Sequence, residues 1–254
     1  MKTFITNRDN NKISVVVEEG GDETKLVFLM HGLGGNKEKP ELRVMAEAFI
    51  EDGYIVVTWD AVHTFGESEG GLFEDATISN YYADLEDVID WAGMQNWYIE
   101  PFVLCGHSLG GISTAVYAQR YPEKVKALAP IATVVNGELR MEIYTDVIDE
   151  WKSKGTWTRP RHGGGYRTLK WSHMEDGMKY DLTNEADKLT MPVLMVVGSN
   201  DTSTPPSHQR ILYDLIPGDK EMHVIEGAEH GFYQQHEREE LKQIIKRWLE
   251  KKVK

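Results

Sequence analysis

One serine of this sequence stands in a pattern that can support nucleophilic chemistry. Residues 104–114 read LCGHSLGGIST, and the pentapeptide from Gly106 to Gly110 has the form G-x-S-x-G. An apolar run precedes it and a segment with helical spacing follows it, which is the context in which a sharp turn exposes a serine hydroxyl. The helix start would also place partial positive charge beside an anion. The pattern predicts that Ser108 is a nucleophile; the alternative is an incidental serine in a glycine-rich turn.

A serine hydroxyl is a weak nucleophile, so this prediction requires a base and a group that orients the base. In a strand–turn–helix arrangement of this kind, the acid and then the histidine follow the serine and lie after strand ends. Asp201 follows the apolar run VLMVVG, and His230 follows the last apolar run before the final helical segment. We expect Asp201 and His230 to form a triad with Ser108. His208 is the rival base and Asp176 the rival acid.

Backbone amides can stabilise the oxyanion that forms during acyl transfer. The stretch HGLGG at residues 31–35 ends an earlier apolar run and is rich in glycine. We expect the N–H groups of Leu33 and Leu109 to form an oxyanion hole. A phosphate-binding loop is disfavoured because no G-K-[ST] follows, and the chain has neither H-E-x-x-H nor paired cysteines to bind a metal. The sequence therefore predicts neither a cofactor nor a metal.

Eight short apolar runs predict the strands that position these residues. They are residues 4–6, 13–17, 26–30, 55–59, 102–105, 127–133, 193–197 and 222–225. From the third run onward, segments with helical spacing alternate with the runs, which indicates a mostly parallel sheet with helices on both faces. The first two runs have no helix between them and predict an antiparallel hairpin at the sheet edge. The expected fold class is α/β, with an eight-stranded sheet.

The alternation breaks between residues 136 and 185, where no clear strand is predicted. Residues 137–153 carry an apolar stripe at helical spacing, and a stretch rich in glycine, arginine and aromatic residues follows. An insert of this length between strands is typical of a lid or binding loop. We expect a cap at residues 136–185 within a single domain of residues 1–254. The candidate substrate-binding residues are Trp157, Tyr166 and Trp171, although packing of the cap alone would also explain these aromatic side chains.

Composition limits the classes of partner. The formal net charge of −13 argues against nucleic acid and against an anionic membrane surface, because both favour basic patches. No stretch approaches the roughly 20 apolar residues of a membrane span, and the first 20 residues contain no apolar signal core. The single cysteine, Cys105, cannot form an intramolecular disulfide and fits a cytoplasmic setting. We expect a small-molecule ester as the partner, and a homodimer stays open.

Together, these motifs resemble the serine α/β-hydrolase family over nearly the whole chain. H-G-L-G-G, G-H-S-L-G-G, G-S-N-D and G-A-E-H-G-F occur in the order of that family. Residues 59–91 and the segments LAPIATVVNGE and VIEGAEHGF are similar to bacterial cinnamoyl or feruloyl esterases and related lipase-like carboxylesterases. The resemblance implies hydrolysis of carboxylic esters through an acyl-enzyme. Cinnamoyl or feruloyl esters and short-to-medium acyl esters are then the candidate substrates.

Two features depart from the pattern of these esterases. The D-x-x-G-x-G-x-S loop, which begins here at Asp60, is one residue longer. The insert also lacks the glutamine that some feruloyl esterases use, beside an acid and a tyrosine, to hold a phenolic ring; Glu138 and Tyr166 match the other two. The resemblance therefore implies ester hydrolysis without defining the acid that is released. Carbon–carbon bond hydrolysis or peptide hydrolysis by the same triad, and a non-catalytic ligand receptor, stay as alternatives.

Overall fold

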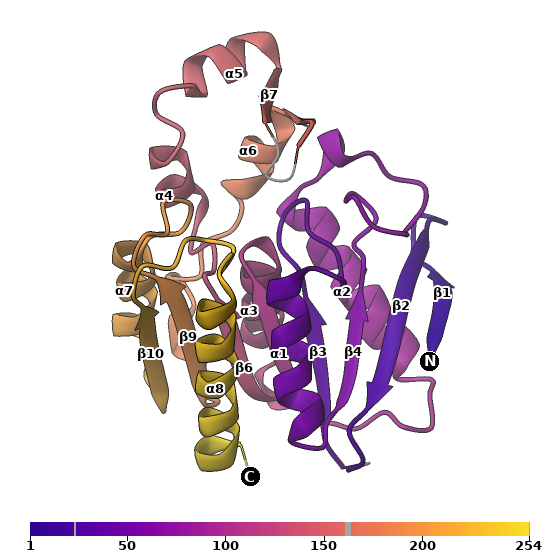
Figure 1. The fold of residues 1–254 in the computed structure, drawn as a ribbon. Helices are drawn as coiled ribbons and strands as arrows, with labels where there is room; N and C mark the ends of the chain where they lie inside the picture. Colours follow the sequence, from indigo (N-terminus) through magenta and orange to yellow (C-terminus); the bar gives the residue numbers. More distant parts are fainter. Residues whose placement is uncertain (23, 161–163, 254) are drawn as a thin grey trace.

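The computed structural model describes residues 1–22, 24–160 and 164–253. Its centre is an eight-stranded sheet with the strand order β1-β2-β4-β3-β5-β6-β9-β10 (Figure 1). The strands are β1 (Lys2–Thr6), β2 (Lys12–Glu19), β3 (Leu26–Met30), β4 (Ile55–Trp59), β5 (Phe102–His107), β6 (Val125–Ile131), β9 (Val193–Gly198) and β10 (Lys220–Ile225). Each of the eight predicted runs overlaps one of these strands.

The pairing of the strands confirms a mostly parallel sheet. β1 pairs with β2 and β2 with β4 in antiparallel register, so the predicted edge hairpin is present. The other neighbours in the sheet are parallel. Every residue of β3, β4 and β5 is buried, as expected for central parallel strands that are covered on both faces. The chain thus has the predicted α/β fold class.

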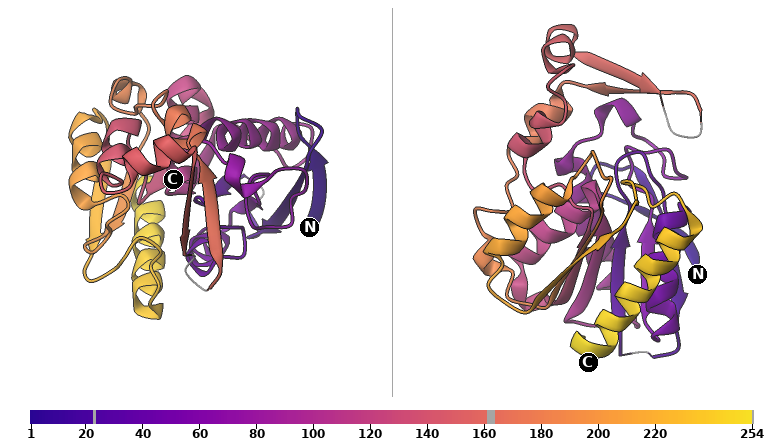
Figure 2. Two further views of the ribbon diagram at one scale, coloured as in Figure 1. Left: turned by 90° about the horizontal axis from the view of Figure 1, so that it is seen from above. Right: turned by 60° about the vertical axis from the view of Figure 1, so that its left-hand side comes forward.

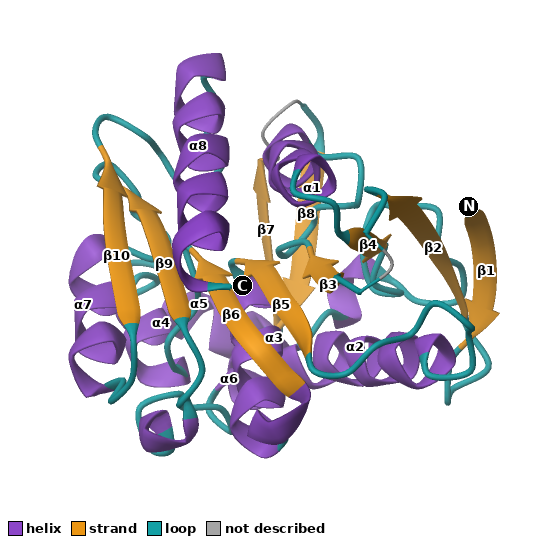
Figure 3. Ribbon diagram, turned by 90° about the horizontal axis from the view of Figure 1, so that it is seen from below, coloured by secondary structure: helices purple, strands orange, loops and turns teal. Residues whose placement is uncertain are grey.

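Helices cover both faces of the sheet and create two separate apolar cores (Figure 3). On one face lie α1 (Pro40–Glu51) and α8 (Gln235–Lys252), where Phe49 and Trp248 are buried. The other face carries α2 (Ile78–Ala92), α3 (Leu109–Arg120) and α7 (Pro206–Leu215), with Leu85 and Leu212 in its core. None of the helices in the described ranges combines the length and apolar character that a bilayer span requires.

The segment between β6 and β9 stands beyond the end of the sheet (Figure 2). It contains α4 (Gly137–Glu142), α5 (Ile148–Lys154), the hairpin strands β7 (Thr156–Pro160) and β8 (Tyr166–Lys170), and α6 (Ser172–Gly177). Short 3₁₀ helices occur at η1 (Phe73–Asp75), η2 (Pro122–Lys124) and η3 (Ala186–Lys188).

Two predictions for this segment are wrong. The apolar stripe at residues 137–153 does not form one helix but two, separated by a turn, so that Trp151 on α5 packs against the hairpin and donates its Nε1–H to the carbonyl of Leu169 (3.1 Å). The β7–β8 hairpin was not predicted, because β7 alternates between exposed and half-buried residues and contains no apolar run. The hairpin depends on tertiary contacts, both within the insert and between Lys170 of β8 and Asp75.

Polar contacts hold the insert over the start of α2. The Ser79 hydroxyl donates to the carboxylate of Asp176 (2.6 Å), and the Lys170 ammonium pairs with Asp75 (2.6 Å). His173 Nδ1 donates to the carbonyl of Ala76 (2.6 Å). These contacts join the insert to the loops that surround the carboxyl ends of the parallel strands.

Candidate active site

The turn between β5 and α3 holds Ser108 in a strained conformation. Its backbone angles are φ 56° and ψ −113°, in the left-handed region that residues other than glycine rarely adopt. A Cβ atom on Gly106 would lie 2.3 Å from the carbonyl oxygen of Gly110, and a Cβ atom on Gly110 would lie 2.5 Å from that of Met30. Both positions therefore require glycine, which explains the G-x-S-x-G spacing.

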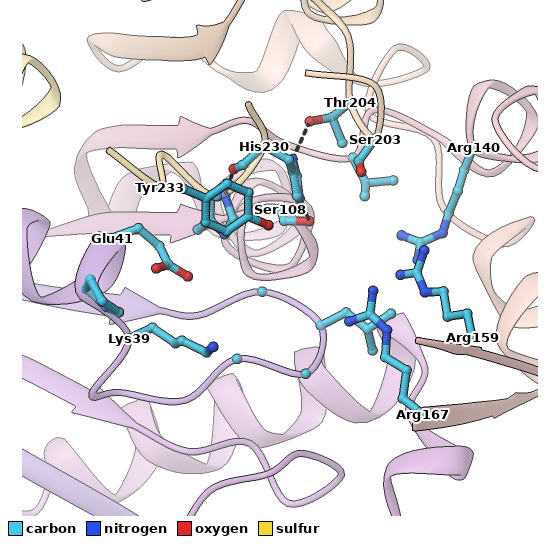
Figure 4. A pocket seen from close by; sticks show the side chains of 18 of the residues that line it. Lys39, Glu41, Ser108, Arg140, Arg159, Arg167, Ser203, Thr204, His230 and Tyr233 are labelled. Atoms are coloured by element: carbon cyan, nitrogen blue, oxygen red, sulfur yellow. Dashed lines mark hydrogen bonds between the residues drawn. The ribbon is translucent and has the colours of Figure 1, made fainter. Parts of the chain in front are cut away.

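The structure brings Ser108, His230 and Asp201 together in one hydrogen-bonded chain. Figure 4 shows Ser108 and His230 where they face the cavity. The Ser108 hydroxyl lies 2.9 Å from His230 Nε2, and His230 Nδ1 lies 2.8 Å from Asp201 Oδ2. Because a carboxylate only accepts hydrogen bonds, the proton of neutral His230 lies on Nδ1 and the lone pair of Nε2 faces the serine hydroxyl. This tautomer is the one that can accept the serine proton.

Asp201 is held as a carboxylate. Burial alone would raise its pKa, but the hydrogen bond and charge of His230 and the backbone amides of Thr204 and Ser203 lower the pKa to about 2. The amides of Ser203 and Thr204 donate to Oδ1 at 2.8 and 2.9 Å, while Oδ2 receives the histidine. The imidazole therefore has a fixed, negatively charged neighbour at neutral pH.

The rival acid and base lie elsewhere. His208 is on α7 with its Nε2 4.0 Å from Glu142, and Asp176 accepts hydrogen bonds from Ser79 and Lys179. Neither His208 nor Asp176 lines the cavity beside Ser108.

Two buried histidines support the site, and the sequence pattern did not indicate either role. His107 Nε2 donates to the backbone carbonyl of His230 (2.9 Å), and burial together with the charge of His230 lowers the pKa of His107 to about 3, so its ring is neutral. His31 Nδ1 donates to the carbonyl of Gly32 (2.7 Å), while its Nε2 accepts from the amide of Ala61 (3.0 Å). The His107 ring thereby positions the loop that carries His230, and the His31 ring positions the loop after β3.

The two amides expected to form an oxyanion hole are available as donors. Leu109 is the first residue of α3 and Leu33 follows β3; within the described ranges, neither N–H donates to a protein acceptor. The loop after β3 passes close to the nucleophile, because a Cβ atom on Gly32 would lie 2.9 Å from the Cβ of Ser108. Two unpaired amides beside a serine are suited to bind an oxyanion.

A cavity of about 470 Å³ opens beside Ser108, within the size range of sites for small molecules. Besides the triad region, its lining residues are Gly32, Leu33, Gly34, Gly35, Lys39, Pro40, Glu41, Val134, Arg140, Tyr144, Arg159, Arg167, Tyr233 and Arg238. In the part of the chain that the structure describes, no group of three or more His, Cys, Asp or Glu side chains could hold a metal ion.

The three aromatic residues predicted to bind substrate are not part of this lining. Trp157 and Trp171 pack against buried Trp151, with ring centroids 5.2 and 5.9 Å apart, and Tyr166 is 75% exposed. Trp157 and Trp171 thus belong to a small apolar core of the insert around Trp151. Glu138, which resembled the acid of feruloyl esterases, is exposed on α4 and also lies outside the lining. Insert residues that do line the cavity are Arg140, Tyr144, Arg159 and Arg167.

Comparison with known proteins defines the family. The model of the family described as "Serine aminopeptidase, S33" matches residues 21–162 and 162–238. The chain belongs to this S33 serine hydrolase family. It is therefore a hydrolase of the α/β-hydrolase type.

Two relatives with similar sequences share less than 30% identity with this chain. An Escherichia coli protein named "Uncharacterized 31.7 kDa protein in traX-finO intergenic region" is 28% identical over 250 residues, which cover 84% of this chain and 86% of that protein. The mitochondrial palmitoyl-protein thioesterase ABHD10 of Mus musculus is 29% identical over 144 residues, or 55% of this chain and 46% of the thioesterase. Neither relationship defines a substrate for this S33 hydrolase.

A solved structure shares the fold over almost the full length. Est1E from Butyrivibrio proteoclasticus, described with ferulic acid bound, has a TM-score of 0.80 at 21% identity, and the match covers 99% of each chain. At this identity the likeness shows the α/β-hydrolase fold alone.

Proposed function

We propose that this S33 hydrolase is a serine carboxylesterase acting on small-molecule esters. Ser108 attacks the ester carbonyl while His230 takes its proton, and Asp201 holds the imidazole in the required tautomer. The amides of Leu33 and Leu109 stabilise the tetrahedral oxyanion. His230 then returns the proton to the departing alcohol, and water releases the acid from the acyl-enzyme.

The observation that carries this proposal is the continuous Ser108–His230–Asp201 hydrogen-bond chain beside two unpaired amides and a cavity of about 470 Å³. A non-catalytic receptor would have no need for a strained serine with an aligned base. In the proposed arrangement, residues 136–185 act as a cap within a single domain. The buried thiol of Cys105 fits a reducing, cytoplasmic setting.

Ester hydrolysis is expected in a panel of p-nitrophenyl esters from acetate to dodecanoate, with methyl ferulate as an aromatic substrate. The cavity favours short-to-medium acyl groups, so kcat/KM should decline for the longest chains. An aminoacyl p-nitroanilide in the same panel tests peptide hydrolysis, which the triad could also perform. Cleavage of the anilide without cleavage of any ester would overturn the proposal in favour of a peptidase.

Replacement of Asp201 by asparagine should lower kcat by about 10⁴-fold, the effect known for the corresponding change in a serine protease. An amide nitrogen next to His230 Nδ1 would move the ring proton to Nε2, and the base could no longer accept the serine proton. Asp187→Asn is the matched control, because Asp187 is exposed on η3 and lies outside the cavity, so this variant should retain activity within a few fold. Equal losses in both variants would show that Asp201 acts only through the fold.

A further inference from the structure

Three arginines of the insert meet in the cavity next to the proposed nucleophile. Arg140 comes from α4, Arg159 from β7 and Arg167 from β8, and their guanidinium groups converge on the space beside Ser108 (Figure 4). Arg140 is only 8% exposed. A Cβ atom on Gly34 would lie 3.3 Å from Arg167 Nη1, which places this guanidinium against the loop of the oxyanion hole.

The charge of the cavity is opposite to that of the protein. Its lining contains five basic residues and one acidic residue, Glu41, although the whole chain has a formal net charge of −13. Within the described ranges, no acidic side chain forms a salt bridge with Arg140 or Arg159. A buried charge without a counter-ion is costly and is retained only where something compensates it.

The hairpin places like charges side by side. Arg159 and Arg167 are directly opposite each other in the β7–β8 register, an arrangement that destabilises an antiparallel pair. Arg159 is oriented by the ring of Trp157, which lies 5.0 Å from its guanidinium carbon. The packed indole therefore serves to position an arginine rather than to line the cavity.

Arg140 is oriented by a neutral group rather than by a carboxylate. Its Nη2 donates to His173 Nε2 (2.7 Å), and His173 Nδ1 donates to the carbonyl of Ala76 (2.6 Å). Burial and the charge of Arg140 lower the pKa of His173 to about 3, so the imidazole is uncharged. The Nε atoms of Arg140 and Arg159 are buried and have no hydrogen-bond partner among the described residues.

The pKa of Tyr144 reflects the positive electrostatic potential of the three arginines. Burial raises the pKa of its phenol, but the charges of Arg140, Arg159 and Arg167 outweigh burial, and the pKa is lowered overall. Even complete ionisation of Tyr144 would supply one negative charge against three guanidinium groups. Arg140 and Arg159 thus carry positive charge that no acidic side chain of the described ranges pairs with.

We infer that Arg140, Arg159 and Arg167 bind an oxyanionic group of the substrate, a carboxylate or a phosphate. The inference rests on the proposed esterase activity and specifies its substrate class: esters that carry a second, anionic group on the acyl or the alcohol part. The planar fork of a guanidinium matches the oxygens of carboxylate and phosphate. The anion supplies a counter-charge to Arg140 and Arg159, which form no salt bridge within the described ranges.

Matched esters test the preference. On the alcohol side, 4-acetoxybenzoate and 4-acetoxyphenyl phosphate are compared with neutral methyl 4-acetoxybenzoate; on the acyl side, monoethyl glutarate is compared with ethyl pentanoate. We expect kcat/KM to be at least tenfold higher for an anionic ester than for its neutral partner in one of the two sets. The alcohol set also separates a carboxylate site from a phosphate site. Equal or lower kcat/KM for every anionic ester would overturn the inference.

Substitution of the hairpin arginines locates the effect. Arg159→Gln and Arg167→Gln should each lower kcat/KM for the preferred anionic ester roughly 10- to 100-fold, the value of one charge-assisted hydrogen bond, and change the neutral ester less than about threefold. Arg247→Gln, at an exposed position of α8, removes the same charge away from the cavity and should change kcat/KM for neither ester. Equal losses on anionic and neutral esters would mean that the arginines only hold the fold.

Binding without turnover separates this inference from the proposed activity. In the Ser108→Ala protein, calorimetry should detect benzoate or inorganic phosphate, but not neutral benzamide, and Arg159→Gln added to that protein should abolish the signal. Anion binding in a protein that hydrolyses no ester would retain the arginine site and refute the esterase. Hydrolysis of neutral esters without anion binding would do the reverse.

Discussion

Replacement of Ser108 by alanine should lower kcat for the best ester by several orders of magnitude, on the order of 10⁶-fold, as for the corresponding change in another serine hydrolase. The reason is that Ser108 Oγ is the hydroxyl that faces His230 Nε2, the ring nitrogen free to accept its proton, at 2.9 Å. The measurement is kcat under saturating substrate, together with labelling by a fluorophosphonate and mapping of the labelled peptide.

Ser207→Ala is the matched control for this loss. Ser207 is exposed in the first turn of α7, so its variant should keep both activity and labelling at Ser108. Full activity of the Ser108→Ala protein, or a label attached to another residue, would refute the assignment of the nucleophile. Because the substitution removes only a hydroxyl group, the alanine variant should also remain folded, which circular dichroism can verify.

Loss of the His230 imidazole should cost nearly as much as loss of the serine, because the two groups act as one unit. His230 connects the serine hydroxyl to Asp201 through both of its ring nitrogens. In the His230→Ala protein, Asp201 would be buried without this partner and the serine would keep its proton. We expect a drop in kcat on the order of 10⁶-fold, measured with the same ester.

His208→Ala is the control that distinguishes loss of the catalytic base from the loss of any histidine. His208 lies on α7, outside the cavity lining, and its nearest acidic group is Glu142 at 4.0 Å. Its variant should retain most of the activity. If His208→Ala were inactive and His230→Ala active, the role of the base would have to be reassigned to His208.

Much of the fold was predictable because its signals are local. The parallel strands are buried on both faces and therefore appear in the sequence as short apolar runs, whose order alone predicts the sheet and its antiparallel edge. The turn at Ser108 was predictable for a related reason. Gly106 and Gly110 are required by close backbone contacts, and that requirement leaves a fixed spacing in the sequence.

The insert was less predictable because its elements depend on one another. The apolar stripe is continuous in the sequence, but the structure divides it between the two helices α4 and α5, because Trp151 on α5 packs on the hairpin. The strands β7 and β8 are short and half-exposed, so the signal of alternating polarity is weak. Of the aromatic residues predicted to bind substrate there, Trp157 and Trp171 pack on Trp151, and none lines the cavity.

The sequence by itself determined the α/β sheet and selected Ser108, Asp201 and His230 as the residues to be brought together, because each follows a strand whose position is encoded locally. Only the tertiary structure decided what faces them. Arg140 and Arg159 are separated from the triad by many residues and appear in the sequence as ordinary surface charges. Their convergence depends on how the insert of residues 136–185 packs. Charge in a cavity is set by which side chains the fold encloses, and the net charge of −13 gave no sign of a positive pocket.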